Sequence, residues 1–104
     1  MKINERAAQL WSLLVLAARN QHILSYAMVE RLTGIDKRGL GRVLEPIQAY
    51  CKRNKLPPLT ILVVKEQTGF PGDGFTEAAE GGKARVFVFD WFKRPAPSPE
   101  DFSN

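Results

Sequence analysis

The sequence predicts an α+β fold in which a helical N-terminal half is followed by a pair of strands. Up to residue 55, apolar residues recur at the three- and four-residue spacing of amphipathic helices. After the two prolines at 57 and 58, the pattern changes to β-branched and aromatic runs that are typical of strands. With 104 residues and a single cysteine, the chain suits one domain that folds without a disulfide.

The first two helices are predicted over residues 5–20 and 25–33. The first has five apolar residues at helical spacing, which are Ala8, Trp11, Leu14, Val15 and Ala18. Ser25 is a suitable N-cap for the second helix. Gly34 suits its C-terminal end, where a residue with positive φ is usually required.

The third helix is predicted over residues 37–53, with Asp36 as its cap. It carries an apolar stripe that we expect to face the core, which is Leu40, Val43, Leu44, Ile47 and Cys51. Pro46 lacks an N–H, so we expect a bend there, or a break between a helix over 37–45 and a second helix that starts at the proline.

The two strands are predicted in LTILVV, residues 59–64, and ARVFVFDWF, residues 84–92. In the second strand Phe87, Phe89 and Trp91 would share the face that packs on the first helix. The glycine-rich loop 66–84 between the strands is longer than a tight hairpin needs, and long loops are usually functional or mobile. We therefore expect one domain over residues 1–92 and a flexible Pro-rich tail over 93–104.

The charge of +4 is distributed unevenly along the chain. Residues 1–55 hold ten Lys or Arg against four Asp or Glu, whereas residues 56–104 hold five against seven. Basic charge concentrated in the helical half is a reason to consider a nucleic-acid partner.

The predicted element order is helix, short helix, glycine-containing turn, third helix and two-stranded hairpin. Over about residues 5–92 this order resembles the winged helix-turn-helix superfamily. The resemblance implies that the helix from residue 37 lies in the major groove and that the hairpin, the wing, reaches the adjacent backbone. The full fold prediction is an α+β, three-helix winged helix-turn-helix with a C-terminal two-stranded β-hairpin wing.

A nearer resemblance is to the DNA-binding domain of alkyltransferases and alkyltransferase-like proteins. It is carried by SYAMVERLTGIDKRGLGRVLEPI and LPPLTILVVKEQTGFPGDGF. That family has a helix near a Tyr-Gly pair, an Arg-Ala-Val-Gly helix, a Pro-Cys-His-Arg-Val-Val strand and a Gly-rich loop. Tyr26, Arg42 and Val63–Val64 fall near matching positions. Because Leu59–Leu62 replaces Pro-Cys-His-Arg, the alkyl-accepting cysteine and its histidine are absent, and the resemblance implies DNA approach without repair chemistry.

The candidate nucleic-acid-binding residues lie on the predicted third helix and at the ends of the predicted wing. They are Lys37, Arg38, Arg42, Gln48, Lys52, Arg53, Lys65, Lys83 and Arg85. Arg38 and Arg42, one turn apart, could read a guanine edge or hold a phosphate, and Gln48 could read adenine if the helix stays straight. Gly39 and Gly41 weaken a helix, so they predict a close approach to DNA or to another helix. The competing interpretation is a solvated basic face with glycines as packing notches.

No arrangement of residues predicts catalysis, a cofactor or a metal site, so we expect a non-enzymatic protein. Cys51 lies on the apolar stripe and is expected to be buried. His22 has no second His or Cys nearby, and the three loop acids Asp73, Glu77 and Glu80 are expected to face solvent.

We expect a small cytoplasmic, DNA-binding regulator or accessory subunit that contacts duplex DNA through the basic face of helix 37–53. The alternative is a protein-interaction module, or an inhibitor of a nucleic-acid-handling complex, that docks through loop 66–84 and the C-terminal tail. No segment is apolar for long enough to predict a membrane span. The sequence leaves a homodimer open.

Overall fold

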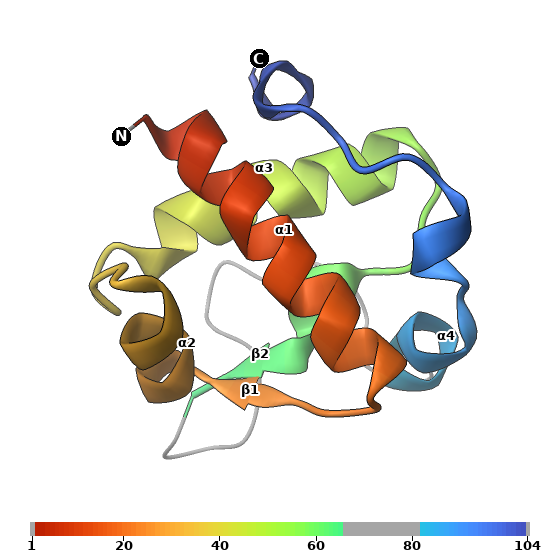
Figure 1. Cartoon of the computed structure of the whole chain (residues 1–104), viewed down its shortest axis with the longest axis horizontal. Coiled ribbons are helices and arrows are strands. Elements are labelled where there is room, and N and C mark those ends of the chain that lie inside the picture. Colours follow the sequence, from red (N-terminus) through yellow and green to blue (C-terminus); the bar gives the residue numbers. More distant parts are fainter. Residues whose placement is uncertain (1, 66–81, 104) are drawn as a thin grey trace.

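The computed structural model describes residues 2–65 and 82–103 (Figure 1). Within these ranges the fold is α+β and mainly helical. Its helices are α1 (Ile3–Arg19), α2 (Tyr26–Thr33), α3 (Leu40–Arg53) and α4 (Gly82–Val88). Its strands are β1 (Leu24–Ser25) and β2 (Val63–Val64), and 3₁₀ turns span Leu59–Leu62, Trp91–Lys93 and Pro99–Phe102. None of the described helices is both long enough and apolar enough to span a membrane.

The core lies where α1 crosses α3 (Figure 1). The Trp11 ring of α1 meets the Tyr50 ring of α3 edge-on, with 5.4 Å between centroids and an interplanar angle of 85°. Trp91 packs on the other side of Trp11 at 5.6 Å, again edge-on. Edge-to-face pairs place the positive rim of one ring on the negative face of another, so this aromatic cluster fixes the orientation of three segments distant in sequence.

The predicted caps of α2 are confirmed. The Ser25 hydroxyl accepts a hydrogen bond from the Met28 N–H at 3.1 Å, and the helix starts one residue later, at Tyr26. Gly34 adopts a φ of 77° and donates its N–H to the Glu30 carbonyl at 2.8 Å, which ends the helix. The connection between α2 and α3 therefore begins where the sequence predicts.

The apolar stripe of α3 is also confirmed, since all five predicted residues are buried. The start of the helix is corrected, because α3 begins at Leu40 and residues 37–39 form a separate turn. Of the two alternatives predicted at Pro46, a bend or a break, the break is wrong, because α3 continues through the proline as one helix to Arg53. Pro46 leaves the Arg42 carbonyl without its usual donor, a loss that burial of the stripe on both sides of the proline outweighs.

The predicted β-hairpin wing is wrong for the residues described. Of LTILVV only Val63 and Val64 are in a strand, and the four residues before them form a 3₁₀ turn. The segment ARVFVFDWF forms most of α4 followed by a 3₁₀ turn instead of a strand. Helical spacing places Gly82 and Val86 on one buried face, and the Trp91 indole N–H donates to the Val86 carbonyl at 2.9 Å. Tertiary packing thus overrides the strand propensity of valine and phenylalanine.

The two strands pair in parallel, with Leu24 opposite Val63 and Ser25 opposite Val64. Parallel pairing requires a crossover connection, and here that connection contains both α2 and α3. The β1–β2 pair therefore joins the segment that leads into α2 to the segment that follows the Leu59–Leu62 turn.

The C-terminal tail over residues 93–104 was predicted to be flexible, whereas the Pro99–Phe102 turn within it packs on α1 and α3. Phe102 is 5% exposed, with its ring 5.4 Å from Tyr50 and 6.0 Å from Trp11. Arg94 donates to the Tyr50 hydroxyl at 2.8 Å. Proline-rich composition concealed one aromatic anchor, which is sufficient to hold the segment against α1 and α3.

Candidate nucleic-acid interface

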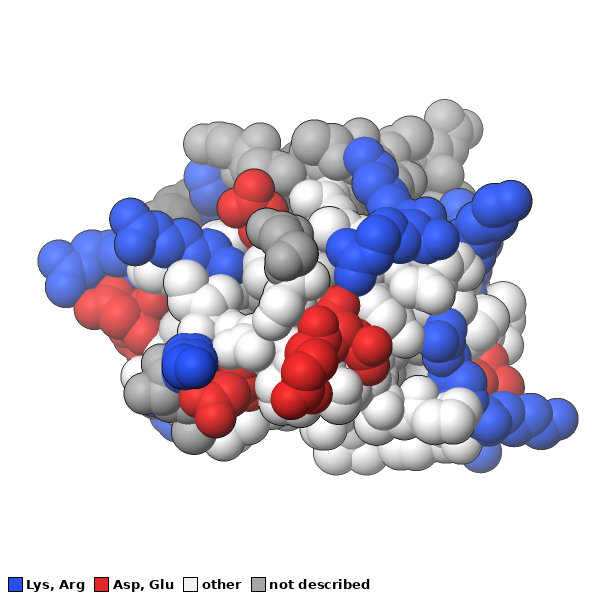
Figure 2. Space-filling view, turned by 90° about the horizontal axis from the view of Figure 1, so that it is seen from above, with Lys and Arg blue, Asp and Glu red and all other residues white. Residues whose placement is uncertain are grey.

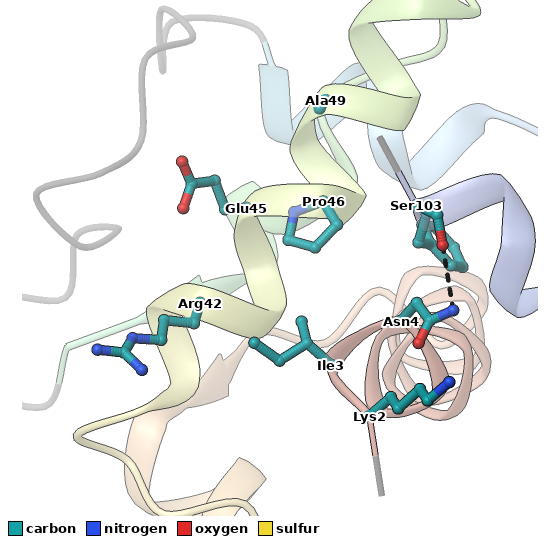
Figure 3. Close-up of a pocket in the computed structure, with 9 residues that line it drawn as sticks. Lys2, Ile3, Asn4, Arg42, Glu45, Pro46, Ala49 and Ser103 are labelled. Carbon is teal, nitrogen blue, oxygen red and sulfur yellow. Dashed lines mark hydrogen bonds between the residues drawn. The ribbon is translucent and has the colours of Figure 1, made fainter.

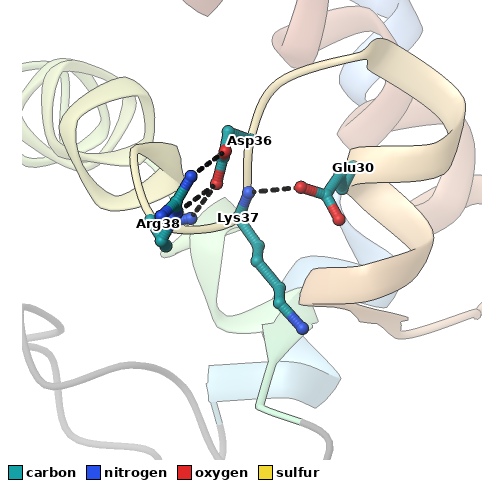
Figure 4. Close-up of polar contacts among 4 residues, drawn as sticks. All are labelled: Glu30, Asp36, Lys37 and Arg38. Carbon is teal, nitrogen blue, oxygen red and sulfur yellow. Dashed lines mark hydrogen bonds and ion pairs between the residues drawn. The ribbon is translucent and has the colours of Figure 1, made fainter.

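Two carboxylates hold the turn that precedes α3 (Figure 4). Glu30 of α2 accepts a hydrogen bond from the Lys37 backbone N–H at 3.0 Å, and Asp36 accepts one from the Arg38 backbone N–H at 2.8 Å. The Gly39 N–H donates to the Asp36 carbonyl at 2.9 Å and closes the turn. The groups that donate in the turn are backbone N–H groups, which leaves the Lys37 side chain exposed.

The Arg38 guanidinium forms a two-point contact with the Asp36 carboxylate. Its Nε lies 3.2 Å from Oδ1 and its Nη2 lies 3.0 Å from Oδ2. The side-chain hydrogen bond from Arg38, followed by the backbone hydrogen bond, lowers the pKa of Asp36 from 3.8 to about 2. Because the Arg38 side chain remains 88% exposed, this contact orients the guanidinium without burying it.

Gly41 and Arg42 continue the exposed surface onto the first turn of α3. A Cβ atom added at Gly41 would meet no atom within 4 Å, so this glycine is not a packing notch. The Arg42 side chain makes no hydrogen bond or ion pair with the part of the chain that the structure describes. We call the exposed set Lys37, Arg38, Gly41 and Arg42 the α3 N-terminal surface.

The later candidates on α3 are in different surroundings. Gln48 is half-buried and Lys52 is exposed. Arg53 donates to the Asp101 carbonyl at 2.8 Å and lies 5.9 Å from the centroid of the Tyr50 ring. Arg53 therefore holds the C-terminal segment, a role that the sequence pattern did not reveal.

Two of the wing candidates, Lys83 and Arg85, are not brought to the α3 N-terminal surface. Lys65 is half-buried directly after β2, and Lys83 and Arg85 are exposed on α4. In Figure 1, α4 lies on the opposite side of the molecule from the connection between α2 and α3. Most of the predicted loop 66–84, including Asp73, Glu77 and Glu80, lies outside the described residues.

A groove of about 680 Å³ borders Arg42 and lies between the start of α1, α3 and the C-terminal segment (Figure 3). Ile3 of α1 and Pro46 of α3 lie on opposite sides of it, and Asn4 donates to the Ser103 hydroxyl at 3.1 Å. Its lining is of mixed character, namely Lys2, Ile3, Asn4, Arg42, Glu45, Pro46, Ala49, Phe102 and Ser103.

Figure 2 shows the charges on the face that carries the C-terminal end of the chain. Lys and Arg side chains lie around its margins, and Asp and Glu side chains lie between them. On this face acidic side chains therefore lie among the cations.

Two carboxylates beside the α3 N-terminal surface have roles that were not recognised from the sequence. Asp36 was expected to cap a helix, whereas it caps a turn and holds the next arginine. Glu30 was not singled out, because its hydrogen-bond donor, the Lys37 N–H, lies seven residues later in the chain.

Cys51 is buried at 2% exposure, and within residues 2–65 and 82–103 no three His, Cys, Asp or Glu side chains are grouped as metal ligands would be.

Comparison with known proteins returned no match, whether to a protein-family model, to a curated protein or to a solved structure.

Proposed function

We propose that this protein is a non-enzymatic duplex-DNA-binding protein, a regulator or accessory subunit, that contacts DNA through the α3 N-terminal surface. Three cationic side chains and one glycine lie there, in the turn 37–39 and at the start of α3. Cations can neutralise backbone phosphates, and an arginine at the start of a groove-lying helix can reach base edges.

Gly41 is the observation that carries this proposal. A glycine near the start of a helix weakens it, and no contact within the described residues requires the missing side chain. The adjacent Arg42 has no partner among the described residues. A close approach by a polyanionic partner accounts for both features, because it uses the open space at Gly41 and the free charge at Arg42.

The helical part of the resemblance to winged helix-turn-helix proteins supports the same mode of approach. The order α1, α2, turn and α3 is that of the motif, although a parallel β1–β2 pair takes the place expected for the hairpin. The proposed likeness to alkyltransferase-like proteins rests on Tyr26, which is the first residue of α2, and on Val63–Val64, which form β2. The segment Leu59–Leu62 is buried and holds neither a cysteine nor a histidine, so the proposal is limited to binding.

The test is fluorescence anisotropy of a labelled, mixed-sequence duplex titrated with the protein at several salt concentrations. Two phosphate contacts, from Lys37 and Arg42, predict a slope of log K against log salt of about −2, so affinity should fall roughly tenfold between about 50 and about 200 mM salt. Absence of binding at the lower concentration would overturn the proposal.

The second candidate is a protein-interaction module, and a different observation favours it. Val88 and Phe92, directly after the predicted docking loop, are 82% and 59% exposed. Large exposed apolar side chains close together in sequence are typical of contact surfaces. Replacement of both residues by serine should leave DNA binding unchanged if the protein is a DNA-binding protein. If it is a protein-interaction module, the same replacement should abolish partner capture or self-association.

A further inference from the structure

The contact between Asp36 and Arg38 uses one particular edge of the guanidinium. The bonds run from Nε and Nη2, which lie on the same side of the group, to the two carboxylate oxygens (Figure 4). A guanidinium has five N–H donors in a rigid plane, so occupying this edge leaves the end formed by Nη1 and the second N–H of Nη2. No described residue accepts a hydrogen bond from Nη1 of Arg38.

The remaining edge is suited to two acceptors that lie side by side in one plane. In the major groove only guanine offers this, through O6 and N7, whereas adenine pairs an acceptor with a donor and thymine has one acceptor beside a methyl group. A phosphate also presents paired oxygens, but it carries a negative charge and would approach next to the Asp36 carboxylate. Asp36 is ionised at neutral pH, and the hydrogen bonds from Arg38 lower its pKa further, to about 2. Like-charge repulsion therefore disfavours phosphate at Arg38, whose guanidinium is bonded to that carboxylate, more than at Arg42, which forms no ion pair with a described carboxylate although Glu45 borders the same groove.

We infer that Arg38, oriented by Asp36, reads a guanine in the major groove of duplex DNA, while Lys37 and Arg42 contact phosphates. Asp36 acts as a positioning residue, since it touches the arginine and not the base. This inference rests on the proposed DNA-binding function and adds a specificity that the function does not require.

The test begins with selection from a library of duplexes with a randomised core. Dissociation constants are then measured for the selected duplex and for versions in which each G·C pair is replaced by A·T. For the wild type, one such replacement should weaken binding by about 5- to 100-fold, the range of a good bidentate contact.

Four variants separate reading from positioning and from charge. Arg38→Ala and Arg38→Lys should both remove the preference at that base pair, since lysine keeps the charge but not the planar pair of donors. Asp36→Asn keeps an oxygen for the Arg38 backbone N–H and should reduce the preference while raising affinity for unselected duplexes. Arg42→Ala should weaken all duplexes to a similar extent and keep the preference. Circular dichroism checks that each variant is folded, and the two Arg38 variants test the inference even if Asp36→Asn disturbs the turn.

Each outcome has a distinct meaning. A guanine preference lost with Arg38→Ala and retained with Arg42→Ala supports the inference. Duplex binding without any base preference, or a preference that survives both Arg38 variants, overturns it and leaves the proposed function standing. No duplex binding at all overturns both.

Discussion

At the scale of single residues, two carboxylates hold the turn before α3 by accepting hydrogen bonds from it. Glu30 fixes the Lys37 backbone, and Asp36 fixes both the backbone and the guanidinium of Arg38. Short acidic side chains before a helix usually cap it, since their oxygens accept the first free N–H groups. Here the same chemistry caps a turn and leaves the cations exposed.

The first prediction concerns the ionisation of Asp36. The pKa of this carboxyl is lowered to about 2, first by the side-chain hydrogen bond from Arg38. A lowered pKa means that the contact is complete above the ordinary value of 3.8 and is lost as the pH falls through about 2. A carbon-detected NMR titration should therefore give a midpoint near 2 for the wild type.

The matched variants for this titration are Arg38→Ala and Arg31→Ala. Removal of the Arg38 side chain should move the Asp36 midpoint upward, towards 3.8, because the hydrogen bond that lowers this pKa most is then lost. Removal of Arg31, an exposed residue of α2, should leave the midpoint in place. A wild-type midpoint near 3.8 would mean that the Asp36–Arg38 contact is not formed in solution.

At the scale of elements, Gly41 links the stability of α3 to its proposed use. Gly41→Ala should stabilise the fold by about 0.5 kcal/mol, because alanine favours the helix and its Cβ meets open space. The same change should weaken duplex binding if DNA approaches the helix at this point. Chemical denaturation and anisotropy measure the two effects on the same samples.

Gly34→Ala is the contrasting variant. Gly34 has a φ of 77°, so alanine there should destabilise the fold by about 1 kcal/mol or more. A Gly41→Ala protein that is more stable and binds DNA as well as the wild type would remove the main support for the close approach.

The C-terminal segment offers a second test at this scale. Phe102→Ala should lower the free energy of unfolding by about 3–5 kcal/mol, since a buried ring is lost from contact with Trp11 and Tyr50. Phe92→Ala, the same change at a ring that is 59% exposed, should have an effect within about 0.5 kcal/mol in urea denaturation. Equal midpoints for the two variants would show that residues 93–103 do not hold the core together.

Which elements could be predicted depends on how local their determinants are. The caps of α2 and the apolar stripes of α1 and α3 lie within each segment, so spacing and cap residues were sufficient to find them. For α4 the local pattern alternates like a strand, and the helix depends on the distant Leu59–Leu62 turn, against which it packs. Gly82 allows that approach, since a Cβ there would lie 3.0 Å from Ile61 Cδ1. Phe102 was missed for the same reason, because its partners lie on α1 and α3.

At the scale of the whole molecule, the parallel β1–β2 pair and the aromatic cluster around Trp11 fix α2 and α3 relative to α1. The α3 N-terminal surface lies on one side of the molecule in Figure 1, and α4 with the Trp91–Lys93 turn lies on the other. The sequence predicted a basic helical half, but it could not show that Arg53 is engaged or that acidic side chains separate the cations. Lys37, Arg38 and Arg42 are exposed around the start of α3, where the sequence had already placed Arg38 and Arg42 one turn apart.

The most direct test compares two double variants that remove the same charge from opposite sides of the molecule. Lys37→Ala with Arg42→Ala removes two cations from the α3 N-terminal surface, and Arg19→Ala with Lys93→Ala removes two that face Asp90. Measured by duplex anisotropy against salt, the first variant should lose about two units of slope and most of its affinity, and the second should match the wild type. Equal losses in both variants, or no loss in the first, would contradict DNA binding through the α3 N-terminal surface.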